Sequence, residues 1–137
     1  MSLVLDASFA LAWCFADETT TQGDQVLRDL RSDYSLVPAI WPLEIANGLV
    51  VAERRGRIDV AIRDDFLGLL MTIDIRIETV DVAHTFTVVF DLARREGLSC
   101  YDAAYLDLAL RKALPLATRD AALAEAARRV GVSVIAV

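Results

Sequence analysis

Four acidic residues stand where a strand is expected to end or a helix to begin. Asp6 directly follows the first short apolar run, and Glu44 lies in the first turn of a helix expected after the second strand. Asp102 opens a later helix, and Asp120 comes just after the fourth expected strand. In parallel sheets the carboxyl ends of the strands form one edge, where ligands bind. The four carboxylates can therefore reach one rim of the sheet.

A divalent cation would stabilise such a group of carboxylates. Ionised carboxylates held together raise one another's pKa values and lower stability. A hard divalent cation removes this repulsion, and oxygen ligands suit Mg²⁺ or Mn²⁺. His84 is the single histidine, so no zinc cluster is expected. One such Asp alone is usually a helix cap; the agreement of four positions favours a shared metal site.

The elements that must position these acids alternate along the chain. Pro42 suits the first turn of a helix and Gly56 its end. The alternation of Ile75, Ile77 and Thr79 with charged residues is typical of a strand. The expected strands are Leu3–Leu5, Leu36–Val37, Ile75–Thr79, Leu116–Thr118 and Ser133–Val137. The expected helices are Ala7–Ala16, Thr20–Arg31, Pro42–Arg55, Ile58–Ile73, Val82–Glu96, Tyr101–Ala113 and Ala121–Val130.

Strands separated by helices imply βαβ units and a mostly parallel sheet covered on both faces. We therefore expect an α/β fold with three layers, α/β/α, around five short strands. A chain of 137 residues suits one domain, expected to span residues 1–137.

Composition predicts a soluble cytoplasmic protein. No apolar run reaches the roughly 18 residues of a membrane span. Asp6 interrupts the N-terminal apolar stretch and no basic segment precedes it, so a secretory signal is not expected. Cys14 and Cys100 form no CxxC motif and are expected to be reduced thiols.

The charge balance argues at first against nucleic-acid binding. The chain has 20 acidic and 14 basic residues, a formal net charge of −6, whereas nucleic-acid binders are normally basic. However, the net charge averages a candidate metal-binding acidic pocket with separate arginine clusters. Lys112 is the single lysine, and arginine suits phosphate contacts. Arg119, between Thr118 and Asp120, is the best candidate for a phosphate contact.

Four stretches of the sequence resemble PIN domains in type, order and separation. These are Leu5-Asp6-Ala7-Ser8, Glu44-Ile45-Ala46-Asn47, Ser99-Cys100-Tyr101-Asp102-Ala103-Ala104-Tyr105-Leu106 and Leu116-Ala117-Thr118-Arg119-Asp120. The block around Tyr101-Asp102-Ala103, taken with Thr118-Arg119-Asp120, is the most specific part. Among PIN domains, the short length resembles VapC, the toxin of VapBC toxin–antitoxin pairs.

The resemblance implies a Mg²⁺- or Mn²⁺-dependent endoribonuclease that forms a homodimer and is held inactive by a cognate VapB-type antitoxin. It also implies that the catalytic and metal-binding acids are Asp6, Glu44, Asp102 and Asp120. Ser8 and Thr118 match the supporting hydroxyl positions. We expect Asp6 and Asp102 to be direct ligands, Asp120 to bind directly or through water, and Glu44 to orient a water or bind a second metal.

Asp107 is excluded from this set. It lies five residues after Asp102, roughly 140° around a helix at about 100° per residue, and is expected to face Arg111 at i+4. His84 is expected on a partly exposed helix face.

Two other functions stay open from the residues alone. A catalytically weak PIN-like binding module would keep the fold without efficient cleavage. A Mg²⁺-dependent phosphatase of the haloacid-dehalogenase type also begins with an Asp after strand one, but it requires a second Asp where Ser8 stands.

Overall fold

The computed structural model describes residues 1–136 and contains five parallel strands in one sheet, in the order β3-β2-β1-β4-β5. The strands are β1 (Leu3–Leu5), β2 (Tyr34–Pro38), β3 (Asp74–Glu78), β4 (Leu116–Ala117) and β5 (Val134–Ile135). Central strand β1 pairs Val4 with Leu36 of β2 and with Leu116 of β4. The carboxyl ends of β1 and β4 are therefore neighbours.

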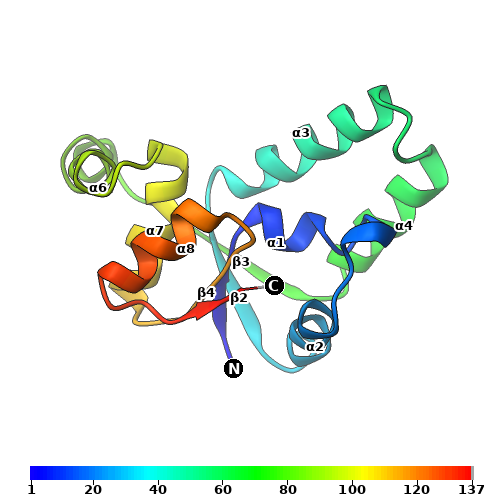
Figure 1. Ribbon diagram of the computed structural model, residues 1–137, viewed down its shortest axis with the longest axis horizontal. Helices are drawn as coiled ribbons and strands as arrows, with labels where there is room; N and C mark the ends of the chain where they lie inside the picture. Colours follow the sequence, from blue (N-terminus) through cyan, green and yellow to red (C-terminus); the bar gives the residue numbers. More distant parts are fainter. Residues whose placement is uncertain (137) are drawn as a thin grey trace.

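Helices cover both faces of this sheet. They are α1 (Ala7–Leu11), α2 (Thr21–Asp29), α3 (Trp41–Arg54), α4 (Val60–Leu70), α5 (Val82–His84), α6 (Phe90–Glu96), α7 (Cys100–Lys112) and α8 (Ala121–Arg129), with a 3₁₀ turn η1 (Ala16–Glu18) and a π-helical segment η2 (Thr85–Val89). Helices α1–α4 lie on one side of the strands and α6–α8 on the other (Figure 1). This is the predicted α/β/α arrangement.

Helices α2, α4, α5, α7 and α8 begin at side-chain caps that the sequence provides. Thr20 Oγ1 accepts a hydrogen bond from Gly23 N at 3.0 Å, and Asp59 Oδ1 accepts one from Ile62 N at 2.9 Å. Each cap satisfies a helical N–H group that has no partner within the helix. Gly97 closes α6 with a φ of 67°, a conformation that glycine adopts at little cost.

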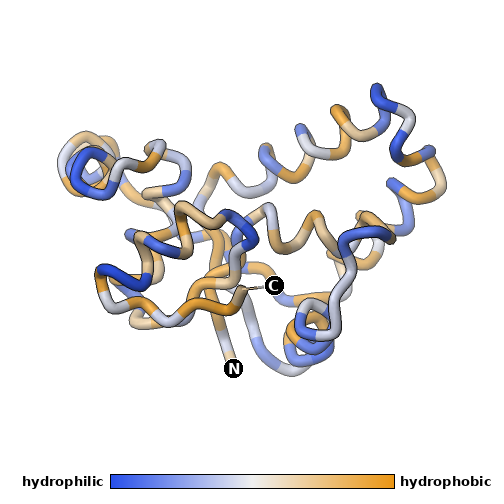
Figure 2. The backbone as a smooth tube through the Cα atoms, in the orientation of Figure 1, coloured by the Kyte–Doolittle hydropathy of each residue, from blue (hydrophilic) through white to orange (hydrophobic). Residues whose placement is uncertain are grey.

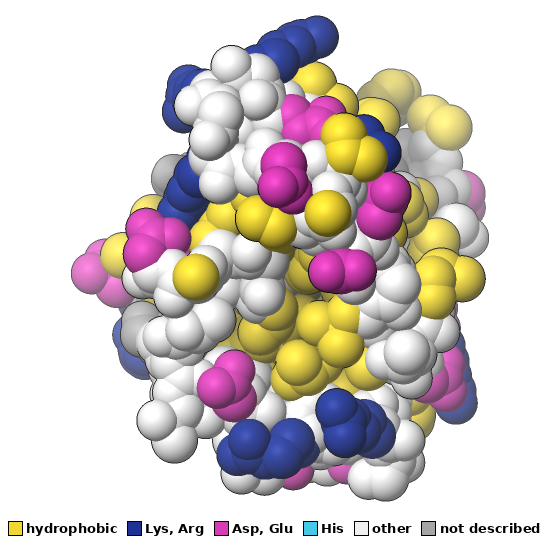
Figure 3. Space-filling model, turned by 90° about the vertical axis from the view of Figure 1, so that its right-hand side faces the viewer, with side chains coloured by type: hydrophobic (Ala, Val, Ile, Leu, Met, Phe, Trp, Pro, Cys, Tyr) yellow, Lys and Arg dark blue, Asp and Glu magenta, His cyan; other side chains and the backbone are white. Residues whose placement is uncertain are grey.

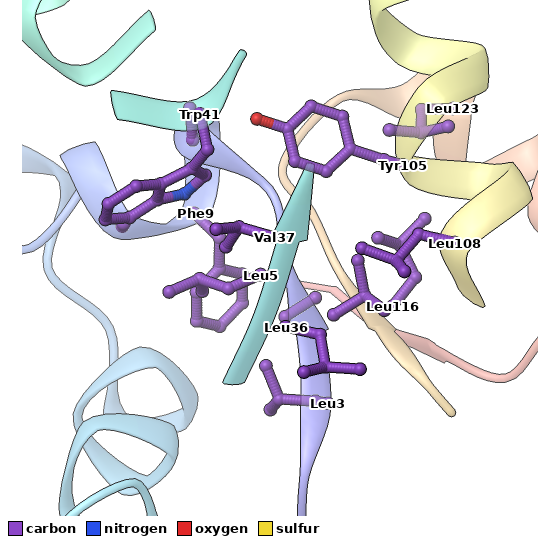
Figure 4. Close-up of a cluster of buried hydrophobic side chains, with 14 of the residues drawn as sticks. Leu3, Leu5, Phe9, Leu36, Val37, Trp41, Tyr105, Leu108, Leu116 and Leu123 are labelled. Atoms are coloured by element: carbon purple, nitrogen blue, oxygen red, sulfur yellow. The ribbon is translucent and has the colours of Figure 1, made fainter. Parts of the chain in front are cut away.

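The core lies on both sides of the sheet. Figure 4 shows Phe9 and Trp41 on one side of β2, and Leu108 and Leu116 on the other. All four are buried, as is Tyr105 of α7. Hydrophobic colouring is concentrated along the central strands, whereas hydrophobic and hydrophilic residues alternate along α3 (Figure 2). This pattern is typical of buried strands and of helices with one face toward the core.

Two predicted helices differ from the structure. The helix predicted over Ala7–Ala16 ends at Leu11, and a turn leads into η1. Phe15, which follows this turn, is buried and has extended backbone angles, so the helix does not continue through it. The helix predicted over Val82–Glu96 is helical throughout, but its middle segment η2 has the wider π geometry.

Strand boundaries also shift. β5 has two residues rather than the predicted Ser133–Val137, whose last position lies outside the described residues. No helix within residues 1–136 is long and apolar enough to cross a membrane.

Candidate functional site

The four acids predicted to share a rim follow the carboxyl ends of strands or lie in first helical turns. Asp6 leaves β1 and stands at the N-cap position of α1, and Asp120 follows β4 at the N-cap of α8. Glu44 and Asp102 lie in the first turns of α3 and α7. Since β1 and β4 are parallel neighbours, Asp6 and Asp120 both lie at the carboxyl end of the strands.

Asp6 is the most deeply buried of the four, with 4% of its surface exposed. Its Oδ2 accepts hydrogen bonds from Ser8 Oγ at 2.6 Å and Thr118 Oγ1 at 2.7 Å. Its Oδ1 takes no side-chain hydrogen bond within the described residues. Together with a backbone hydrogen bond from Ser8, these contacts hold the carboxylate in one orientation.

The two hydroxyls also accept hydrogen bonds from the loop after β4. Arg119 N donates to Ser8 Oγ at 3.1 Å, and Asp120 N donates to Thr118 Oγ1 at 3.0 Å. Ser8 and Thr118 therefore connect the ends of β1 and β4, which fixes Asp120 relative to Asp6.

Glu44 has a partner that the sequence reasoning missed. Tyr105 OH donates to Glu44 Oε1 at 2.8 Å, joining α7 to α3. Burial raises the pKa of Glu44, and Asp6 and Asp102 raise it further against the opposing effect of the tyrosine. The signal for Tyr105 was its place one helical turn after Asp102, on the same face of α7.

Asp102 has the clearest electrostatic signature. Burial raises its pKa to about 6, with further contributions from the charges of Asp120 and Asp6. Burial likewise raises the pKa of Asp6, where the hydrogen bonds from Ser8 and Thr118 oppose it and Asp120 adds to it. Asp6, Glu44 and Asp102 therefore have raised pKa values, mainly because they are buried and partly because of the charges of neighbouring acids.

The acids do not converge on one point. Within residues 1–136, no group of three or more His, Cys, Asp or Glu side chains is placed closely enough to hold a metal ion. Their chemistry nevertheless fits a hard cation, because the donors are carboxylate oxygens that already raise one another's pKa values. The same repulsion opposes their closer approach.

Arg119 is engaged in an ion pair. Its guanidinium binds Glu18 of η1, which also pairs with Arg57. Arg57 in turn lies over the ring of Phe15, with 3.9 Å from its Cζ to the ring centroid. A phosphate would have to compete with Glu18 for Arg119, a partner 101 residues away in sequence.

Asp107 lies apart from this site, as predicted. It is buried, and its Oδ2 accepts a hydrogen bond from Arg111 Nε at 3.0 Å and lies 2.9 Å from His84 Nε2. It lines a separate cavity of about 260 Å³ beyond Pro38. His84 is partly exposed, as expected, and connects α5 to α7.

Two hollows lie near α3. One, of about 380 Å³, is lined by Ile40, Leu43, Glu44, Asn47 and Tyr101, so it opens beside a predicted site residue. The other, of about 530 Å³, is apolar and lies between α3, α4 and β3. The side of the molecule that carries α3 and α4 has a hydrophobic hollow bordered by acidic and arginine side chains (Figure 3).

Comparison with known proteins points to one family. The family model described as PIN domain matches residues 3–129. The chain is 30% identical over 125 residues to Ribonuclease VapC3 of Pyrobaculum aerophilum, covering 91% of this chain and 94% of that protein. The crystal structure of PAE2754 from the same organism has a TM-score of 0.72 at 22% identity, covering 98% of this chain and 89% of that one. This last likeness supports the fold.

Proposed function

The chain belongs to the PIN domain family and is of VapC type, and from this we propose that it is a metal-dependent endoribonuclease, the toxin of a type II toxin–antitoxin pair. The observation that carries the proposal is Asp6, a buried carboxylate oriented by two hydroxyls beside three further acids. A carboxylate buried with other acids is unfavourable for stability unless it binds something.

We assign the metal-binding set to Asp6, Glu44, Asp102 and Asp120. Asp6 and Asp102 are the proposed direct ligands of Mg²⁺ or Mn²⁺, and Asp120 binds directly or through a water. A bound divalent cation supplies a water of lowered pKa and neutralises charge that develops on the phosphate.

The protein's own residues prepare this chemistry. Ser8 and Thr118 fix the orientation of Asp6 through its Oδ2. Glu44 would orient the attacking water or bind a second metal ion. Its Oε2 remains for this role, because Oε1 already accepts a hydrogen bond from Tyr105. Arg119 binds a substrate phosphate when it leaves Glu18.

The proposed partners are an RNA substrate, a VapB-type antitoxin and a second copy of the chain. Support for protein partners comes from the exposed hydrophobic side chains Val82, Phe86 and Phe90 on one helical segment, which are 67%, 72% and 51% exposed. Large exposed apolar patches mark interaction surfaces. We place the protein in the cytoplasm and propose that residues 1–137 form one PIN domain.

A binding module with weak catalysis is the second candidate. It is favoured by one observation, the lack of three convergent acids within the described residues. Under this alternative the family fold would present RNA- or protein-binding surfaces without efficient cleavage.

The two candidates differ in whether the protein cuts RNA when a divalent metal is present. Purified protein is incubated with a structured RNA in Mg²⁺, in Mn²⁺ and in EDTA, and with a small phosphoester in parallel. We expect cuts in the RNA with either metal and none in EDTA. RNA binding without cuts in any metal would favour the binding module, and phosphate release from the small ester would favour a phosphatase.

A further inference from the structure

Tyr105 is a buried polar side chain to which none of the assigned steps gives a role. The residue is 0% exposed and is the largest of the fully buried side chains. Its ring lies in the core between α7 and the sheet, and its hydroxyl points toward α3 (Figure 4). A phenylalanine would fill the same space, so packing alone does not explain the hydroxyl.

The hydroxyl has one side-chain partner within the described residues, and that partner belongs to the proposed site. Tyr105 OH donates to Glu44 Oε1 at 2.8 Å, across 61 residues of sequence. A buried O–H group without a partner costs stability, so this bond also satisfies the tyrosine. The hydroxyl also accepts a hydrogen bond from the backbone N–H of Ala7, so Tyr105 connects α7 both to α3 and to the start of α1.

The bond restricts the side chain of Glu44. Glu44 lies in the first turn of α3 and is half-buried beside the hollow lined by Leu43 and Tyr101. A glutamate has three side-chain torsions, so without a partner its carboxylate could turn into this hollow. With Oε1 held by Tyr105, Oε2 remains for other contacts.

Tyr105 also couples two of the acids. It lies three residues after Asp102 on α7, so both side chains belong to the same helical face. The hydrogen bond from Tyr105 directs Glu44 Oε1 toward α7, the helix that carries Asp102, and leaves Glu44 only partly exposed. The rigid helix therefore sets the position of Asp102 directly and that of Glu44 through the tyrosine.

We propose that Tyr105 is a positioning residue that holds Glu44 toward Asp6 and Asp102 and thereby raises the affinity of the site for a divalent cation. This inference rests on the proposed function, since it assigns the cation to these acids. It is analogous to partners in other metal sites that orient a ligand without binding the metal.

The test substitutes Tyr105→Phe, which removes the oxygen and keeps the ring. Tyr34→Phe is the matched control, because Tyr34 lies at the start of β2 with Arg76 over its ring, at the opposite end of the strands. Isothermal titration calorimetry with Mn²⁺ measures metal binding without RNA. We expect Tyr105→Phe to weaken Mn²⁺ binding about 10-fold or more, and Tyr34→Phe to leave it unchanged.

A double-mutant cycle distinguishes the positioning of Glu44 by Tyr105 from a merely structural role of Tyr105. Glu44→Gln and the double variant Tyr105→Phe/Glu44→Gln are titrated in the same way. If Tyr105 acts through Glu44, its loss has little further effect once the glutamate charge is gone. An equal loss of Mn²⁺ affinity from Tyr105→Phe in both backgrounds would overturn the proposal, as would unchanged affinity in the single variant.

Stability is followed by circular dichroism. If Tyr105→Phe fails to fold, Glu44→Gln and Glu44→Leu provide the test, because glutamine keeps an oxygen for Tyr105 and leucine does not. The hydrogen bond then predicts that Glu44→Leu is the less stable, and equal stability would contradict it. Wild type that binds Mn²⁺ but does not cut RNA would count against the nuclease and leave the role of Tyr105 standing.

Discussion

At the scale of the residue, the site depends on neutral hydroxyls that hold a buried charge. Ser8 and Thr118 both donate to Asp6 Oδ2, and each also accepts from a backbone N–H after β4. A neutral donor orients a carboxylate without forming the ion pair that a lysine or arginine would form. A cation would therefore not have to displace a basic side chain from this carboxylate.

Thr118→Val tests the contribution of one hydroxyl. Thr118 is fully buried, so the change removes a hydrogen bond to a buried carboxylate and leaves an N–H of Asp120 without its acceptor. We expect the free energy of unfolding in urea to fall by about 1–3 kcal/mol. Thr87→Val is the control, since Thr87 is exposed and bonds its own helix at Ala83. Equal effects from the two variants would contradict the role of Thr118.

Asp102 predicts a pH dependence in metal-free buffer. Its pKa in the folded chain is about 6, against an ordinary value of 3.8, mainly because of burial. A raised pKa means that the folded state binds the proton more tightly. Its stabilising contribution is therefore full below pH 3.8 and is lost as the pH rises through about 6.

The measurement is the free energy of unfolding of wild type minus that of Asp102→Asn, in EDTA from pH 4 to pH 7. We expect this difference to decrease as the pH rises, because the wild type alone must ionise Asp102. A difference that stays constant, or increases with pH, would show that Asp102 is not held among acids.

The sequence indicated the four acids and the supporting hydroxyls of Ser8 and Thr118, but not the partners of Glu44 and Arg119. Asp6, Glu44, Asp102 and Asp120 stand out because a strand end or a helix start is readable locally. Tyr105 and Glu18 do not, because the groups they bind lie 61 and 101 residues away in sequence. Such contacts follow from the packing of elements, which no local pattern records.

At the scale of the element, a glycine of α3 lies close against a leucine side chain of α1. A Cβ added at Gly48 of α3 would lie 2.7 Å from Leu11 Cδ1 of α1, whereas one added at Gly68 of α4 would meet nothing within 4 Å. Since α1 begins after Asp6 and α3 begins near Glu44, this close approach helps to place two site residues.

Gly48→Ala and Gly68→Ala form a matched pair. Alanine favours helix over glycine by about 1 kcal/mol, so Gly68→Ala should stabilise the chain. At Gly48 the side chain of Leu11 must move, and we expect this variant to be less stable than Gly68→Ala by about 1–3 kcal/mol. Urea unfolding measures both. Equal stabilisation by both substitutions would mean that α1 and α3 are not closely packed.

Element types were predictable, and their irregularities were not. The segment over Val82–Glu96 has helical periodicity, but nothing in it indicates the π geometry of Thr85–Val89. Similarly, the apolar run after Asp6 suggests one long helix. Nothing in the local sequence indicates that Phe15 has an extended backbone and a buried side chain.

At the scale of the whole molecule, alternation of strands and helices was sufficient to predict a parallel three-layer fold. It did not predict the order β3-β2-β1-β4-β5, because several orders satisfy the same alternation. Part of the net charge of −6 is concentrated in one region, since four of the 20 acids belong to the candidate site. One divalent cation would reduce the net charge to −4.

Metal binding should therefore stabilise the whole chain. A cation that binds the folded state alone stabilises by about 2.7 kcal/mol at 100 times its Kd. We expect Mn²⁺ to raise the melting temperature of wild type and of Asp107→Asn, whose carboxylate faces His84 and Arg111. Asp102→Asn should show little or no rise. A rise that is equal in all three proteins would place the cation elsewhere.

The central claim is that Asp6 anchors a metal-dependent nuclease site, and Asp6→Asn tests it most directly. Wild type and variant are incubated with the same structured RNA in Mn²⁺, and circular dichroism verifies that both are folded. We expect wild type to cut the RNA and folded Asp6→Asn not to cut it. A folded Asp6→Asn protein that cuts RNA as fast as wild type would contradict the central claim.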